Sequence, residues 1–331
     1  MALDKAIKDF PKQIEFEPVV ENTEKLKPFG FAQGKSRKFA VCGMGGSHLA
    51  ADLIKIARPD LDIIIHSSYG LPEIGDLDER LIIVNSYSGN TEEALDSFGE
   101  ALEKKLNLAA ISIGGKLLEQ AQNKGIAFVK IPDTGIQPRM ALGFFVLALL
   151  KLMWWDEEIA KVKKIAGDLD SGLEDAGKEL SKKLDGKIPV IYTSGKNSAL
   201  ALNWKVIFNE TAKIPAFYNI FPELNHNEMT GFDFTPESKK LSQNLAFIFL
   251  RDHEDDPRII KRMDMTQKLL EDRGFEVFPG SNPGVSGIRS PWHKIFSSIL
   301  IAEWTAYYLA LHCGAEPEQV PMVEEFKKMI K

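Results

Sequence analysis

Two short stretches of this sequence place hydroxyl groups and backbone N–H donors where a phosphate could bind. The first, GMGGSHLA, sets three glycines ahead of Ser47 and a helical pattern. Glycine lets the backbone approach a ligand closely, and the first turn of a helix offers N–H groups that favour an anion. The second, NSYSGNTEE, follows an apolar run. The expected phosphate-binding residues are Gly45, Gly46, Ser47, Ser86, Ser88 and Thr91.

Each stretch also has a plainer interpretation. A glycine turn alone fits tight strand-to-helix packing without a ligand equally well. Asn90 and Glu93 could form an ordinary capping box, which leaves Ser86 and Ser88 unexplained. These two serines lie two apart in an expected extended segment and should point the same way. The turns carry no Lys or Arg, which favours a phosphate ester held as a handle over a transferred phosphoryl group.

The elements that must position these turns follow a strand–helix rhythm. Apolar runs near residues 38–43, 62–68, 80–89, 107–115 and 127–132 alternate with helical patterns, and a long helix is expected from about 138 to 155. A charged, strand-free stretch follows, and strands then recur near 187–195, 244–252 and 275–280. We predict an α/β protein of two doubly wound, flavodoxin-like α/β/α domains, residues 1–155 and 156–331, related by a diverged duplication.

Composition narrows the function classes. The 331 residues are 44% hydrophobic and 27% charged with a formal net charge of −6, so no global basic field attracts nucleic acid or anionic lipid. The most hydrophobic segment, residues 140–150, is too short to span a bilayer. Two distant cysteines favour a reducing, cytoplasmic location. Six histidines lack zinc-site spacing, so we expect no metal.

The motifs together resemble a known family. GMGGSHLA followed by NSYSGNTEE resembles a sugar isomerase (SIS) domain. WKVIFNETAKIPAFYNIFPELNHNEMTGF, QPRMALG and the C-terminal TAYYLALHCGAEPEQVPMVEEFKKMI are similar to bifunctional phosphoglucose/phosphomannose isomerases, and the likeness runs from about residue 20 to the C-terminus. The resemblance implies isomerisation of glucose 6-phosphate and mannose 6-phosphate to fructose 6-phosphate through a cis-enediolate. No cofactor is expected.

The resemblance also implies roles for four side chains. Glu210 would move the proton between carbons 1 and 2, and partial burial near the negative end of a helix would make it a stronger base. His226 would open the sugar ring from the partner subunit of a homodimer with shared sites. Arg139 would steady the enediolate oxygen, and Lys327 would assist ring opening. Without the resemblance, Glu210 could simply pair with Lys213, and Arg139 could sit at a solvated helix end.

Two positions depart from the family pattern or leave its assignment open, and two alternative functions are considered. Lys328 and Lys331 are alternatives to Lys327 for the role of assisting ring opening. Val320 stands where relatives often carry a threonine near the sugar. One rival is a phosphosugar-binding SIS regulator, although no basic helix-turn-helix segment precedes Lys38. The other is an isomerase of a different phosphosugar.

Overall fold

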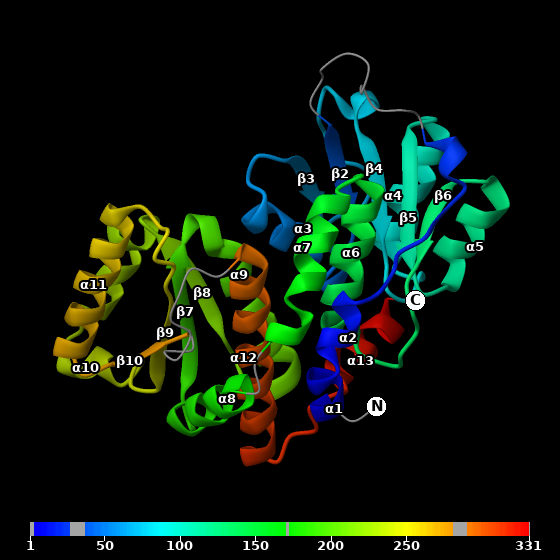
Figure 1. Ribbon diagram of the computed structural model, residues 1–331. Coiled ribbons are helices and arrows are strands. Elements are labelled where there is room, and N and C mark those ends of the chain that lie inside the picture. Colours follow the sequence, from blue (N-terminus) through cyan, green and yellow to red (C-terminus); the bar gives the residue numbers. More distant parts are fainter. Residues whose placement is uncertain (1–2, 27–36, 170–171, 281–289, 331) are drawn as a thin grey trace. The chain divides into compact units, whose positions relative to one another are not determined.

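Runs that are apolar at successive positions form the strands of two separate sheets (Figure 1). The computed structural model describes residues 3–26, 37–169, 172–280 and 290–330. Its contacts divide the chain into two units: unit 1 is Lys8–Asp168, and unit 2 is Leu169–Lys331 with Ala2–Ile7. The domain boundary expected at residues 155 and 156 falls at the start of α7 (Asp156–Lys164), within unit 1, and stays a prediction.

Sheet A of unit 1 has the strand order β1-β6-β5-β4-β2-β3. The strands are β1 (Val20–Glu21), β2 (Lys38–Cys42), β3 (Asp62–His66), β4 (Leu81–Asn85), β5 (Asn107–Ser112) and β6 (Ala127–Lys130). The last five are parallel and follow the flavodoxin-like order, whereas β1 pairs antiparallel with β6 at the edge. The doubly wound α/β fold class is therefore confirmed, and the antiparallel edge strand is an addition.

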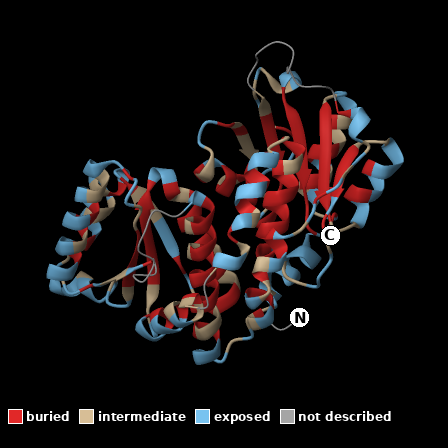
Figure 2. Cartoon of the chain, viewed as in Figure 1, coloured by how far each residue is buried: buried red, intermediate tan, exposed pale blue. Residues whose placement is uncertain are grey.

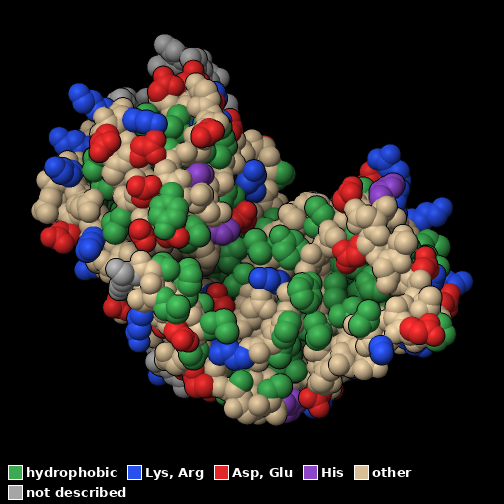
Figure 3. Space-filling view, turned by 180° about the vertical axis from the view of Figure 1, so that it is seen from behind, with side chains coloured by type: hydrophobic (Ala, Val, Ile, Leu, Met, Phe, Trp, Pro, Cys, Tyr) green, Lys and Arg blue, Asp and Glu red, His purple; other side chains and the backbone are tan. Residues whose placement is uncertain are grey.

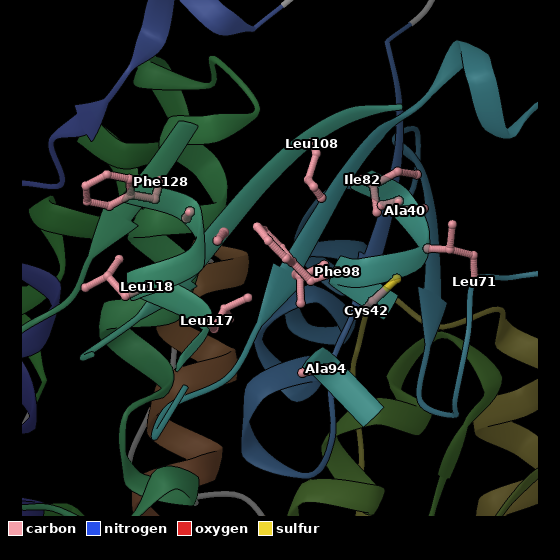
Figure 4. Packing of buried hydrophobic residues seen from close by; sticks show 14 residues of the cluster. Ala40, Cys42, Leu71, Ile82, Ala94, Phe98, Leu108, Leu117, Leu118 and Phe128 are labelled. Atoms are coloured by element: carbon pink, nitrogen blue, oxygen red, sulfur yellow. The ribbon is translucent and has the colours of Figure 1, made fainter. Parts of the chain in front are cut away.

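Helices cover both faces of sheet A, and its central strands are therefore buried along their whole length. Phe98 of α4 (Glu92–Glu103) packs among Ala40, Ile82 and Leu108 of the sheet, and residues of α5 (Gly115–Lys124) extend this cluster (Figure 4). The helices of unit 1 are α2 (Phe10–Ile14), α3 (Gly46–Ala57), α4 (Glu92–Glu103), α5 (Gly115–Lys124), α6 (Leu142–Leu152) and α7. The long helix expected from 138 to 155 is wrong in its bounds: Pro138–Met140 form a separate 3-10 turn, η3, before α6.

Sheet B of unit 2 is wholly parallel, with the strand order β10-β9-β7-β8. The strands are β7 (Ile188–Ser194), β8 (Phe217–Phe221), β9 (Leu245–Leu250) and β10 (Glu276–Pro279). This order matches the first four strands of the flavodoxin-like arrangement, so the two units share a winding. Strand β8 is not among the strands expected from the sequence.

Two layers of helices flank sheet B (Figure 1). Helix α11 (Pro257–Asp272) lies on one face, and α9 (Ser198–Ile207) and α12 (Pro291–His312) lie on the other. On the α11 face, the ring of Tyr192 packs at a tilt against Phe247 and Phe249, and this cluster includes apolar side chains of α11. The helices of unit 2 are α1 (Leu3–Lys8), α8 (Gly172–Lys183), α9 (Ser198–Ile207), α10 (Pro236–Lys239), α11 (Pro257–Asp272), α12 (Pro291–His312) and α13 (Pro321–Met329).

Burial follows the layers: the central strands are buried along their length, the edge strands are partly exposed, and the helices that flank the sheets are buried mainly on their inner sides (Figure 2). On the surface, acidic and basic side chains are interspersed on the face drawn in Figure 3, as the nearly balanced composition predicts. Within the described ranges, no helix combines the length and apolarity that crossing a bilayer demands.

Candidate active site

The glycine turn joins β2 to α3 at the point where sheet A reverses its winding. Strand β2 lies between β3 and β4, so ligands of such a sheet bind beyond the carboxyl ends of β2 and β4. Gly45 has φ of +50°, which only glycine adopts at little cost. A Cβ on Gly43 would lie 2.7 Å from the carbonyl oxygen of Asn85, so the turn needs glycine to pass the end of β4.

The turn after β4, residues 86–91, is called the hydroxyl turn here. It is hydrogen-bonded directly to the glycine turn, residues 43–47. The backbone N–H of Tyr87 donates to Ser47 Oγ at 3.2 Å. Ser86 Oγ lies 2.8 Å from Thr91 Oγ1 and accepts from the backbone N–H of Gly89 at 3.1 Å. Ser47 and Ser86 are buried, at 5% and 1% exposed, and Thr91 is half-buried. Three hydroxyls from two turns therefore gather at the winding reversal, next to the N-termini of α3 and α4.

The plainer interpretation of Asn90 and Glu93 as a capping box is wrong. Thr91 is the N-cap residue of α4, and no side chain caps this helix. Asn90 instead accepts from the backbone N–H of Lys116 at 3.2 Å and donates to the carbonyl oxygen of Ser88 at 3.1 Å. Asn90 thus ties the hydroxyl turn to the start of α5 and leaves the first turn of α4 without a side-chain acceptor.

Ser86 and Ser88 also differ from expectation. Strand β4 ends before Ser86, so the two serines do not share one extended segment. Ser88 is exposed, and its Oγ accepts from the backbone N–H of Asn90 at 3.2 Å. The two hydroxyls therefore have different surroundings, and Ser86 is the one held beside Thr91.

Arg139 lies against the glycine turn. A Cβ on Gly46 would lie 2.7 Å from the carbonyl oxygen of Pro138 and 2.9 Å from Cα of Arg139, so only glycine permits this approach. Arg139 is 3% exposed, which excludes the solvated helix end considered from the sequence. A buried guanidinium is costly unless it is paired, and its backbone is fixed beside Gly46. Unit 1 therefore holds the backbone of Arg139 against the glycine turn that precedes Ser47.

Glu210 lies in a turn of π-helix, η6 (Phe208–Ala212), that continues α9. A π-helical turn contains one inserted residue, and such insertions occur often at functional sites. Phe208 and Thr211 are buried in the turn, whereas Glu210 is half-buried. Lys213 ends the segment in the left-handed region, and its Nζ donates to the backbone carbonyl of Glu210. The turn anchors itself by its buried side chains and leaves Glu210 at the surface of the core.

His226 is exposed at the end of a 3-10 turn, η7 (Glu223–His226), and its neighbours hold it in place. Asn225 Nδ2 donates to Thr266 Oγ1 of α11 at 2.9 Å. Asn227 Nδ2 donates to Glu223 Oε1 at 2.9 Å. Glu228 accepts from the hydroxyl of Tyr192 and from Asn219 Nδ2. The histidine is therefore presented outward on a loop fixed to α11, β7 and β8.

Lys327 lies on α13, whose side chains are all exposed. Its Nζ bonds Glu324 Oε1 at 2.7 Å, one turn earlier on the same helix. In the described ranges, no group of three or more His, Cys, Asp or Glu side chains is placed to hold a metal ion.

Comparison with known proteins decides the family. Residues 173–330 match the family described as "Bacterial phospho-glucose isomerase C-terminal SIS domain". The bifunctional phosphoglucose/phosphomannose isomerase of Aquifex aeolicus is 31% identical over 99% of this chain and 98% of its own length. The protein of the same description from Caldicellulosiruptor bescii is 33% identical over 88% of this chain and 89% of its own. The chain belongs to the bifunctional phosphoglucose/phosphomannose isomerase family.

Solved structures show the same fold across both units of this family member. Glucosamine-6-phosphate deaminase of Thermotoga maritima has a TM-score of 0.70 and 15% identity, and the match covers 96% of each chain. Tagatose-6-phosphate ketose/aldose isomerase of Escherichia coli has a TM-score of 0.69 and 14% identity, covering 95% of this chain and 94% of the other. At these identities the likeness establishes the fold alone, a doubly wound α/β architecture.

Within this isomerase-family chain, the predicted site residues fall into two sets. Unit 1 brings together the glycine and hydroxyl turns and Arg139, and unit 2 carries Glu210, His226 and Lys327. Their assignment as site residues stays a prediction. Sequence reasoning missed Glu228 and Tyr192, which fix the loop of His226. The acid within ELNHNEM was the available signal for Glu228, whereas Tyr192 comes from a strand 34 positions before His226 and gave none.

Proposed function

We propose that this chain interconverts glucose 6-phosphate and mannose 6-phosphate with fructose 6-phosphate by proton transfer through a cis-enediolate. One observation carries the proposal: in a member of this isomerase family, Ser47, Ser86 and Thr91 cluster where sheet A reverses its winding. That point is where doubly wound sheets bind their ligands. The substrate class, a sugar phosphate, follows from the family and from the hydroxyl donors.

The phosphate of the substrate binds to neutral donors in unit 1. Ser47 and Ser86 offer hydroxyls, and the uncapped first turn of α4 offers backbone N–H groups that favour an anion. A phosphate held this way is a handle, because transferring it would require concentrated cationic charge at the leaving oxygen. Binding energy from the remote phosphate then positions the reacting carbons.

The chemistry takes place at the other end of the substrate. Glu210 removes the proton from carbon 2 of the open-chain aldose and returns it to carbon 1, so one carboxylate serves both half-reactions. Arg139 stabilises the negative oxygen of the enediolate intermediate. His226 and Lys327 assist the proton movements that open the ring. Both aldoses share the enediolate, and the face of carbon 2 that is reprotonated decides which one returns.

A homodimer with shared active sites and a cytoplasmic location belong to the same proposal. His226 is exposed on a fixed loop, which suits a residue that completes a partner's site. Strand β8 is an edge strand, and its Phe217 and Tyr218 are 58% and 40% exposed. Exposed aromatics at an edge favour burial against another chain. Cys42 and Cys313 are both free, as expected in a reducing compartment.

The test is turnover of each aldose 6-phosphate in the presence of EDTA, measured as fructose 6-phosphate formed. We expect turnover of both sugars. Glu210→Gln should lower kcat by at least about 1,000-fold while sugar phosphate still binds, because the proton acceptor is lost and the phosphate site is intact. Glu237→Gln, an exposed glutamate in the same unit, is the matched control and should keep wild-type rates.

The rivals give different results in this assay. A phosphosugar-binding regulator would bind the substrate without turnover by wild-type protein. An isomerase of another phosphosugar would leave both aldoses untouched and act on a different ester in a substrate panel. Loss of activity with EDTA, restored by a divalent metal, would contradict the metal-free proton transfer.

A further inference from the structure

A cavity of about 330 Å³ lies in unit 2 beside the loop of His226. Its walls come from the 3-10 turns η7 and η8 (Glu228–Phe232), the C-terminal half of α11 and one side chain of β7. This volume is at the lower end of the range for small-molecule sites. Neither the hydroxyl cluster of unit 1 nor Glu210 contributes to it. The cavity is therefore separate from the residues assigned to isomerisation.

The floor of the cavity consists of buried, mainly apolar side chains. Tyr192, Leu270 and Phe232 line it and are 1%, 3% and 9% exposed. These side chains belong to the aromatic cluster that packs α11 against sheet B, where Phe232 meets Phe247 edge to face at 5.2 Å. Such a floor binds an apolar side chain, and an aromatic ring would add edge-to-face contacts with its rings.

The rim of the cavity carries one charge of each sign. Arg273 Nη2 bonds Asp233 Oδ1 at 2.6 Å, and the two side chains are 34% and 60% exposed. An exposed ion pair contributes about 1 kcal/mol or less, so a ligand can replace it at little cost. A zwitterion could replace both partners of this ion pair. Its carboxylate would take the place of Asp233 beside Arg273, and its ammonium group would take the place of Arg273 beside Asp233.

The cavity also contacts the residue next to His226. Asn225 lines it, and bonds both Thr266 Oγ1 at 2.9 Å and Arg262 Nη1 at 3.2 Å. Thr266 is 2% exposed and lines the same wall. A molecule in the cavity would therefore contact Asn225 and Thr266, whose hydrogen bond helps to hold the loop of His226.

We propose that this cavity is a regulatory site for a free α-amino acid with an apolar side chain. The side chain lies on Tyr192 and Phe232, and the carboxylate and ammonium groups pair with Arg273 and Asp233. Occupancy alters isomerase activity through Asn225, which precedes His226. The coupling to activity rests on the proposed function, whereas binding does not.

Isothermal titration of the full-length protein with L-phenylalanine tests binding. We expect saturable binding of one molecule per chain, weakened at least tenfold in Arg273→Gln, because one of the two head-group contacts is lost. Arg258→Gln, at the other end of α11 and 88% exposed, is the matched control and should bind as wild type does. Phenylacetate and phenethylamine, each with one charge, should bind at least tenfold more weakly. Absence of saturable L-phenylalanine binding, or equal binding of all three compounds, would overturn the proposal.

Thr230→Trp gives a second route in case Arg273→Gln folds poorly. Thr230 is exposed at the mouth of the cavity, so an indole there should block entry without touching the core. We expect L-phenylalanine binding to be abolished and thermal unfolding to stay near wild type; unchanged binding would contradict the location. Saturating L-phenylalanine should change kcat at least twofold in wild type and not in Thr230→Trp. Binding without any change in kcat would overturn the regulatory role, whereas absence of turnover in the ligand-free wild type would overturn the proposed function instead.

Discussion

The two units share a winding but differ in the chemistry at the point where each sheet reverses. In unit 1, the carboxyl ends of β2 and β4 carry uncharged hydroxyls, those of Ser47, Ser86 and Thr91. In unit 2, the carboxyl ends of β7 and β9 carry charges that satisfy one another. Asp252 bonds Lys196 at 3.1 Å and Lys294 at 3.2 Å. The first arrangement leaves hydroxyl donors for a ligand, and the second supplies its own counter-ions.

This difference indicates how a duplicated fold can keep one ligand site. An anion entering the crevice of unit 2 would have to displace Asp252 and Glu254 from two lysines, because Lys294 also bonds Glu254 at 2.7 Å. Asp252 is additionally held by the backbone N–H of Glu254 at 3.0 Å. Four mutually paired charges replace the phosphate that the equivalent turn of unit 1 is proposed to bind. Three substitutions test the contrast, each with a counterpart in the other unit or a neutral control.

Of these three substitutions, Gly46→Ala is expected to have the largest effect. The added Cβ would meet the backbone of Pro138 and Arg139 at 2.7–2.9 Å, so the glycine turn or Arg139 must shift. A displacement of about 1 Å at a reacting group costs about 100-fold in rate, and we expect kcat/KM for glucose 6-phosphate to fall by that amount. The measurement is steady-state kinetics on folded variants.

Gly195→Ala, in the corresponding turn of unit 2, is the matched control. Its Cβ would lie 3.9 Å from the nearest atom, the carbonyl oxygen of Phe221, and no strain follows. We expect wild-type kinetics. If both alanines reduced kcat/KM equally, the two turns would have the same importance and the contrast between the units would be lost.

A smaller effect is expected from Ser86→Ala. The hydroxyl accepts from the backbone N–H of Gly89 and lies beside Thr91, so its loss removes one proposed phosphate donor and disturbs a second. A hydrogen bond to a charged group contributes about 1.5–3 kcal/mol, so KM should rise about 10-fold or more with kcat nearly unchanged.

Ser194→Ala is the unit 2 control, because Ser194 is a buried hydroxyl at the end of β7, the strand that corresponds to β2. Ser194 Oγ accepts from Asn197 Nδ2 at 3.1 Å, within the unit 2 turn. We expect an unchanged KM and a loss of stability of about 1 kcal/mol, measured by denaturant unfolding. A rise in KM for Ser194→Ala comparable with that for Ser86→Ala would show that the unit 2 turn also contributes to substrate binding.

The sequence predicts the architecture better than it predicts local geometry. Runs such as LIIVN are apolar on both faces, so the parallel strands and their winding follow directly. Strand β8 was missed because its Phe217 and Tyr218 are exposed at a sheet edge, where the pattern of burial is weak. The capping box was wrong because Asn90 bonds α5, an interaction with a residue 26 positions away that local spacing does not contain.

The candidate site shows the same division. The candidate phosphate-binding hydroxyl residues can be chosen from the sequence because they follow apolar runs that predict the ends of strands. The π-helical turn around Glu210 cannot, since an inserted residue leaves a helical composition unchanged. The approach of Gly46 to Arg139 cannot either, because it joins positions 93 residues apart through backbone atoms. Both missed features are backbone geometries that residue types alone do not specify.

The smallest effect on catalysis is expected from Asp252→Asn, which tests the structural role of the unit 2 charges. Burial alone would raise the pKa of Asp252, but the N–H of Glu254 and the ammonium groups of Lys196 and Lys294 outweigh it and lower the pKa from 3.8 to about 2. A carboxylate with a lowered pKa stabilises the folded state above its unfolded pKa, and this contribution disappears as the pH falls through the folded pKa. The difference corresponds to about 2 kcal/mol at neutral pH.

We therefore expect Asp252→Asn to lower the free energy of unfolding by about 2 kcal/mol at pH 6, and the deficit relative to wild type to shrink between about pH 4 and pH 2. Denaturant unfolding at pH 6 and at pH 2 measures this deficit. Asp272→Asn, at an exposed position, is the control and should have the same stability as wild type. The kcat/KM at neutral pH should stay within about twofold, because the unit 2 turn holds no substrate in this scheme. An equal deficit at pH 6 and pH 2 would mean that Asp252 acts through packing and hydrogen bonds instead of its charge, and the ion pairs would then no longer account for the difference between the two units.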